Sequence, residues 1–193
     1  MVSRRLLGWG VLVLLGTACS AARPAVVKAS SEEGTGGAGP VAEVEPRRYV
    51  DEELGFEFTR PGGEWLLDET DEETPEGLAI PVVLRHRSSG AQVVLQVAPA
   101  VATPTQFAER LTVGLRSQPG FSTTDPHPLR LSDSAVGFDF SVGDSVRGRV
   151  AVRDGSPGRV FMMLATWPTT ASAEVLRNVD AVFESIRPLP DQT

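Results

Sequence analysis

Residues 160–167, Val-Phe-Met-Met-Leu-Ala-Thr-Trp, are apolar almost throughout. Successive side chains of an extended chain point to opposite faces, so this run places apolar groups on both of its faces. One face carries Val160, Met162 and Leu164, and the other carries Phe161, Met163 and Ala165. A strand of this kind is typical of the middle of a sheet that is covered on both sides. The run therefore predicts a central strand whose two faces the rest of the fold must bury.

Five further segments have the two-residue period or the valine-rich composition of strands. They are residues 55–60, 80–87, 91–97, 136–140 and 146–153. Short turns join neighbouring segments, as at residues 88–90 and 154–158. Connections this short are typical of hairpins, so they indicate an antiparallel sheet.

A helix is expected to begin after Thr103. This residue is a favourable N-cap, Pro104 suits the first helical position, and Gln106 completes a capping box. Apolar residues recur every four positions after it, so they share one face; they are Phe107, Leu111 and Leu115. The helix is expected to end near residues 119–120.

A second helix is predicted near the C-terminus. Leu176, Val179, Phe183 and Ile186 recur at helical spacing, and Pro188 is expected to end the helix. The order of elements is therefore strands, helix, strands, helix. With a doubly apolar central strand, this order predicts an α+β fold in which an antiparallel sheet has helices on both faces.

Residues 1–18 have the pattern of an export signal. Arg4 and Arg5 form a positive region, residues 6–16 are apolar, and Cys19 follows shortly after them. The apolar stretch is shorter than the roughly 20 residues that cross a bilayer. Residues 15–19, Leu-Gly-Thr-Ala-Cys, resemble a bacterial lipobox, although Leu15 lies one position further from the cysteine than is usual. The resemblance implies a diacylglyceryl group on Cys19, cleavage before it, and acylation, for example with palmitate, of the new N-terminus.

Two alternatives remain for this segment. In an ordinary signal peptide Cys19 would be incidental, but it is the only cysteine of the chain and lies where cleavage is expected. Residues 3–7, Ser-Arg-Arg-Leu-Leu, also resemble a twin-arginine export motif, in which Gly8 breaks the expected apolar pair. We expect a lipid-anchored protein of the cell envelope, at the outer membrane and facing the periplasm.

The composition changes near residue 48. Residues 19–47 are rich in Ala, Ser, Gly and Pro and have neither a helical nor a strand period, so they predict a flexible tether after the lipidated Cys19. Residues 48–193 carry all the periodic segments and are long enough to bury one core. The predicted organisation is a signal peptide (1–18), a tether (19–47) and one domain (48–193).

Two segments of this domain resemble the PsbP-like group. Residues 55–65 look like the opening strand and Pro-x-x-Trp turn of that group, and residues 175–187 look like its closing helix with a Ser-x-Arg tail. The group includes oxygen-evolving-enhancer subunits of photosystem II, a Ran-binding relative and bacterial lipoproteins. The resemblance implies an α/β/α sandwich and a non-enzymatic role in assembly or binding. No functional residue of those proteins can be placed on this chain.

Composition excludes several functions. There are 25 acidic against 18 basic residues and the net charge is -7, which argues against a nucleic-acid binder. One cysteine and two histidines, His86 and His127, offer no metal-ligand spacing, so both histidines are expected at the surface. No nucleophile elbow, P-loop or zinc-protease motif is present in the sequence. We therefore expect no enzyme and no cofactor.

Charge is concentrated early in the domain. Residues 68–76 hold six carboxylates and no apolar side chain; the candidate docking or cation site comprises Asp68, Glu69, Asp71, Glu72 and Glu73. Unpaired carboxylates are costly to bury, so the segment is expected to be an exposed loop between early strands. The loop could serve solubility alone, dock a basic partner, or bind a divalent cation weakly.

A second charged group consists of arginines at period two. Arg147, Arg149 and Arg153 are expected on one face of a strand. The simpler interpretation is an exposed face kept soluble by charge. The alternative is a contact face for anionic headgroups, for glycan phosphates or for the acidic segment of the same domain.

These patterns together predict a lipoprotein that the lipid holds at the membrane and whose domain binds a protein partner. A carrier or sensor for a small ligand or a divalent cation is the alternative. A large apolar pocket would favour the carrier, whereas an exposed apolar or charged patch would favour the partner-binding module.

Overall fold

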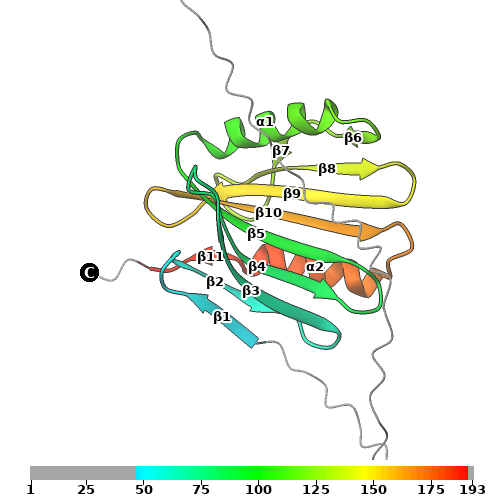
Figure 1. Ribbon diagram of the computed structural model, residues 1–193, viewed down its shortest axis with the longest axis horizontal. Helices are drawn as coiled ribbons and strands as arrows, with labels where there is room; N and C mark the ends of the chain where they lie inside the picture. The colour runs from blue at the N-terminus through cyan, green and yellow to red at the C-terminus, as the bar shows by residue number, and fades with distance from the viewer. Residues whose placement is uncertain (1–46, 191–193) are drawn as a thin grey trace, which may run out of the picture. The chain divides into compact units, whose positions relative to one another are not determined.

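The computed structural model describes residues 47–190 (Figure 1). The predicted signal peptide, Cys19 and the tether as far as residue 46 lie outside the described residues. The strands and helices of the described part, in chain order, are β1 (Arg47–Asp51), β2 (Phe56–Arg60), β3 (Trp65–Glu73), β4 (Ala79–His86), β5 (Gln92–Pro99), α1 (Pro104–Arg116), β6 (Phe121–Thr123), β7 (His127–Pro128), β8 (Val136–Val142), β9 (Val146–Asp154), β10 (Arg159–Pro168), α2 (Ala173–Ser185) and β11 (Arg187–Pro188).

The main sheet has eight strands, and all its pairs are antiparallel. Its order is β3-β4-β5-β10-β9-β8-β6, with β7 paired to β8, and Figure 1 shows most of these strands side by side. Strand β10 lies between β5 and β9, and Leu164 is opposite both Val94 and Val150. The prediction of a central strand at residues 160–167 is therefore confirmed.

The two faces of β10 belong to two hydrophobic clusters. Phe161, Met163 and Ala165 join the cluster that contains the apolar side of α2. Val160 and Met162 join the cluster that contains the apolar side of α1. Two separate clusters thus explain why both faces of one strand are apolar.

A small sheet closes the first cluster. It has the order β1-β2-β11, so it joins the beginning of the described chain to its end. Phe56 and Phe58 of β2 are buried and pack in the same cluster as Trp65 of β3. Part of the cover over the main sheet is therefore β structure.

Helix α1 begins as its local signals predict. Thr103 Oγ1 accepts a hydrogen bond from the Gln106 backbone N–H, and the Gln106 side chain accepts one from the Thr103 N–H, which completes the capping box. Phe107 and Leu115 are buried against the second cluster. The helix ends at Arg116, a little earlier than expected.

Helix α2 begins after the N-cap Ser172, whose hydroxyl accepts from the Val175 N–H. Its buried face consists of Val175, Val179, Val182 and Phe183. The predicted stripe was partly wrong, because Leu176 is only half-buried. Its neighbour Val175 takes the inward position at the first turn.

The predicted fold class is wrong. We expected an α/β/α sandwich of the PsbP-like kind, with helices covering both faces of an antiparallel sheet, but the fold is rich in β structure: strands take 47% of the described residues and helices 18%. The physical reason is one of size. A helix of 13 residues is about 20 Å long and about 10 Å wide, whereas eight strands span more than about 30 Å. One helix cannot form a layer over such a sheet, and the small sheet supplies part of the cover.

In the described part of the chain, no helix has the length and apolar character needed to cross a membrane.

Candidate functional site

The acidic segment is a sheet edge. Residues 68–73 belong to β3, which is the outermost strand of the main sheet and pairs only with β4 in that sheet. The prediction of a loop is therefore wrong for residues 68–73, whereas residues 74–76 do lie in the connection between β3 and β4. An acidic segment can pair as a strand because the hydrogen bonds between strands join backbone groups. Glu69 and Asp68 lie opposite Val82 and Val83, which are apolar residues of β4.

The register of β3 shifts between Glu69 and Glu72. Such an irregularity is typical of a β-bulge, which bends an edge strand and increases its twist. Glu69, Asp71, Glu72 and Glu73 are exposed, and none of them forms an ion pair with any residue in the range 47–190. Asp68 differs, because it pairs with Arg85 of β4. Four unpaired carboxylates thus line a strand whose outer edge makes no ladder in this sheet.

A divalent-cation site at these residues has no support in the geometry. Side chains of an extended strand alternate between its faces, so neighbouring carboxylates do not converge on one point. Over residues 47–190, no group of three or more His, Cys, Asp or Glu side chains could hold a metal ion. What this edge offers is a row of negative charges.

The three arginines of β9 have different roles. Arg147 is exposed. Arg149 bonds through Nε to Asp139 of β8 at 2.9 Å and through Nη1 to Asp180 of α2 at 2.7 Å. Burial on its own would lower the pKa of Arg149, but the hydrogen bond and charge of Asp139 and the charge of Asp180 raise it.

Arg153 also contacts α2, at the C-terminal end of the helix. Its Nη1 donates to the backbone oxygen of Ile186, the C-cap of α2, at 2.7 Å. Burial lowers the pKa of this guanidinium. Arg149 and Arg153 therefore fasten α2 to the sheet, and an exposed basic contact face at these two positions is a wrong prediction. The acidic strand β3 is also not their partner.

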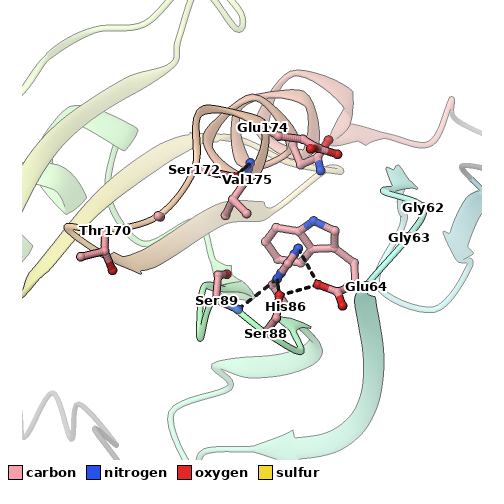
Figure 2. A pocket seen from close by; sticks show the side chains of 13 residues that line it. Gly62, Gly63, Glu64, His86, Ser88, Ser89, Thr170, Ser172, Glu174 and Val175 are labelled. Atoms are coloured by element: carbon pink, nitrogen blue, oxygen red, sulfur yellow. Dashed lines mark hydrogen bonds and ion pairs between the residues drawn. The ribbon is translucent and has the colours of Figure 1, made fainter.

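A cleft of about 510 Å³ lies where β3 begins. Three chain segments form it: the turn before β3, the β4–β5 hairpin, and the start of α2. The polar side chains that line it are Glu64, Trp65, His86, Ser88, Ser89, Thr170, Ser172, Glu174 and Asn178. Figure 2 shows Glu64, His86 and Ser88 close together below Ser172, the N-cap of α2, and Glu174 of the helix.

His86 contacts three neighbouring residues of this cleft. Its Nδ1 accepts the Ser89 backbone N–H at 3.3 Å, so a neutral ring carries its proton on Nε2. Nε2 lies 3.9 Å from Oε2 of Glu64, and Trp65 packs edge-on against the ring at a centroid distance of 5.2 Å. The imidazole is 12% exposed, so the prediction of a surface histidine is wrong here. His127 is exposed.

The three polar groups do not form a Ser–His–acid relay. Ser88 Oγ donates directly to Oε2 of Glu64, and its distance to His86 Nδ1 is 3.5 Å. The Nδ1 lone pair already accepts a backbone N–H, so the imidazole is not placed to take the hydroxyl proton. The arrangement is suited to binding a polar group.

Sequence reasoning missed this cleft. Glu64 and Ser88 are 24 positions apart, and the helix that completes the wall lies near the other end of the domain. One signal could have been used: the hairpin 88–90 places Ser88 and His86 at the same end of β4 as the beginning of β3.

No protein-family model matches the chain, and no curated protein matches it. The resemblance to the PsbP-like group therefore stays a prediction from two sequence segments.

Proposed function

We propose that this chain is a cell-envelope lipoprotein whose domain is a non-enzymatic module that binds a protein partner or serves as an accessory subunit of an envelope assembly. Its anchor would be the acylated Cys19, and residues 19–47 would hold the domain away from the outer membrane on the periplasmic side. Two or more acyl chains give stable attachment, whereas one gives only marginal attachment.

The partner that we propose is a basic segment in extended conformation. The free edge of β3 supports this proposal, because an extended segment can add to such an edge as a further strand. Backbone hydrogen bonds would supply affinity. The unpaired carboxylates of Glu69, Asp71, Glu72 and Glu73 would favour Lys and Arg side chains in that segment.

The same charges argue against pairing between copies of this chain. Two acidic edges repel each other, and charged edge strands are a common protection against edge-to-edge aggregation. A basic strand meets no such repulsion. The carboxylates of β3 would therefore disfavour self-association and favour the proposed basic partner.

A carrier is the less well supported alternative. The cleft at Glu64 is unsuited to an apolar ligand, because hydroxyl, carboxylate and imidazole groups line it. The acidic edge, in contrast, is an exposed charged patch, which is the feature that favours a partner-binding module.

Strand addition can be tested with a synthetic peptide that alternates lysine and valine. We expect it to bind the full chain, and its affinity should fall about tenfold or more in the triple variant Asp71→Asn, Glu72→Gln, Glu73→Gln. This loss should shrink at high salt, because exposed charges are screened within about 10 Å at 0.1 M salt. The free energy of unfolding should change by about 0.5 kcal/mol or less, since these side chains are exposed.

Two controls make this experiment specific. The variant Glu109→Gln, Asp144→Asn, Glu184→Gln removes three exposed carboxylates from other elements and should bind the peptide as the unchanged chain does. The same peptide with N-methylated backbone amides should bind weakly, because it cannot extend the ladder. Equal losses in both triple variants would show that net charge, and not the β3 edge, causes binding.

A further inference from the structure

The cleft at the start of β3 has a chemistry that the strand-edge proposal does not use. We propose that it binds an alkylammonium or alkylguanidinium group of a molecule that also carries a hydrogen-bond acceptor. The inference concerns the walls of the cleft and does not depend on strand addition along β3.

Charge decides the sign of the ligand. Glu64 and Glu174 both line the cleft, and no lysine or arginine does. The start of α2 also faces it, and a helix N-terminus carries an effective charge of about +0.5. Two carboxylates outweigh this dipole when His86 is neutral, so a cation is favoured over an anion.

The acceptors are placed for a donor-rich cation. Oε2 of Glu64 already accepts from Ser88, whereas no residue in the range 47–190 donates to its Oε1. The Glu64 side chain is 56% exposed, so a ligand can reach it. Hydroxyl oxygens of Ser88 and Ser89 provide further acceptors near Glu64, as Figure 2 shows, and Thr170 lines the cleft further away. Ammonium and guanidinium groups have several N–H donors and no acceptor, which fits this set.

Trp65 is the reason why the ligand is expected to carry a hydrogen-bond acceptor as well as a cation. This residue lines the cleft and is 1% exposed, and its Nε1–H has no acceptor among the described residues. A buried donor without a partner destabilises the fold. A carbonyl or hydroxyl oxygen of a ligand that reached this N–H would remove this cost. An ion such as Na⁺ offers no such acceptor, so an organic cation is favoured.

This chemistry has two sources. One is the basic side chain of a polypeptide, whose backbone carbonyl is the acceptor, and the other is a free small amine or amino acid derivative. Both place a cation against Glu64 and Glu174, so the two must be separated by experiment.

The probe is N-acetyl-arginine amide, titrated into the full chain and followed by the indole N–H signal of Trp65 in ¹H–¹⁵N NMR spectra. Comparison with Trp65→Phe assigns the signal. We expect a saturable shift, and we expect N-acetyl-norleucine amide, which lacks the cation, to give none. Equal shifts with both compounds would overturn the proposal.

Matched variants locate the site. Glu64→Gln or Glu174→Gln should weaken binding of the probe about tenfold, whereas Glu184→Gln, at the opposite end of α2, should leave it unchanged. Equal weakening by Glu184→Gln would overturn the proposal, because net charge would then explain the binding. The absence of saturable binding to the unchanged chain would also overturn it, whatever the outcome at the β3 edge.

A second titration separates the two sources. If the cation belongs to a polypeptide, arginine within a five-residue peptide of otherwise neutral residues should bind about tenfold more tightly than N-acetyl-arginine amide. Equal affinities would assign the cleft to a small free amine or amino acid derivative. In either case, the ligand must bind more weakly to Glu64→Gln than to the unchanged chain.

Discussion

Tyr49 is an internal probe of the small sheet, because it is the only tyrosine of the chain. Its ring lies beside Phe58, with centroids 5.1 Å apart, on the inner side of β1 and β2. Burial, followed by the negative charges of Glu69 and Asp51, raises the pKa of Tyr49 to about 12. The phenol therefore stays protonated over a wider range of pH in the folded protein than in the unfolded chain.

We predict that a spectrophotometric titration will show tyrosinate forming near pH 12 in the folded protein and near the ordinary value of 10.0 in denaturant. A raised folded pKa means that the contribution to stability is complete below about pH 10 and is lost as the pH rises toward 12. Between about pH 10 and pH 12, the free energy of unfolding should therefore fall less in Tyr49→Phe than in the unchanged chain. Coincident titrations in the folded and unfolded states would contradict the prediction.

Single residues also show which contacts can be predicted from the sequence and which cannot. Thr103 and Gln106 cap α1 as predicted, because a capping box involves residues three positions apart. His86 and Arg149 were misjudged, because their partners Glu64 and Asp180 are 22 and 31 positions away. No local pattern contains such partners.

Among the elements, β9 shows why one position of an alternating strand is glycine. A Cβ on Gly148 would clash with the Phe140 ring and lie 2.7 Å from the backbone oxygen of Ala165. The strand on each side leaves no room for the extra atom, because β8 and β10 both pair with β9. Gly114, in α1, is the opposite case: nothing lies within 4 Å of its ideal Cβ.

The same substitution should therefore have opposite effects in the two elements. Gly148→Ala should lower the free energy of unfolding by about 1–3 kcal/mol through overpacking. Gly114→Ala should raise it by about 0.5–1 kcal/mol, because alanine loses less backbone entropy in a helix. Denaturant unfolding of both variants measures this, and a Gly148→Ala protein as stable as the unchanged one would show that β8 or β10 can move aside.

On the scale of the whole molecule, one carboxylate joins the two ends of the described chain. Glu57 of β2 is 6% exposed and bonds to Arg48 of β1 through Nε at 2.8 Å and to Arg187 of β11 through Nε at 2.5 Å. The hydrogen bond from Arg48, then that from Arg187, lowers the pKa of Glu57 below its ordinary value of 4.5, although burial opposes them.

This network predicts a pH dependence of folding. Because the folded pKa is depressed, the contribution of Glu57 is present above the ordinary value of 4.5 and is lost as the pH falls below it through the folded pKa. Thermal melts of Glu57→Gln should show a lower melting temperature at pH 7, and the difference from the unchanged chain should shrink as the solution becomes more acidic. A difference that stays constant down to strongly acid pH would exclude ionisation of Glu57 as its cause.

The sequence by itself determined the features that depend on a few consecutive residues: the apolar run at 160–167, its hairpin neighbours and the cap at Thr103. It also predicted two helices, but not how little of the sheet a 13-residue helix covers. Tertiary structure decided that the acidic segment 68–73 is an edge strand, that Arg149 and Arg153 hold α2, and that Glu64, His86 and Ser88 meet in one cleft. The reason is physical: period and capping come from the geometry of the local backbone, whereas pairing and burial depend on which distant segments the topology brings together.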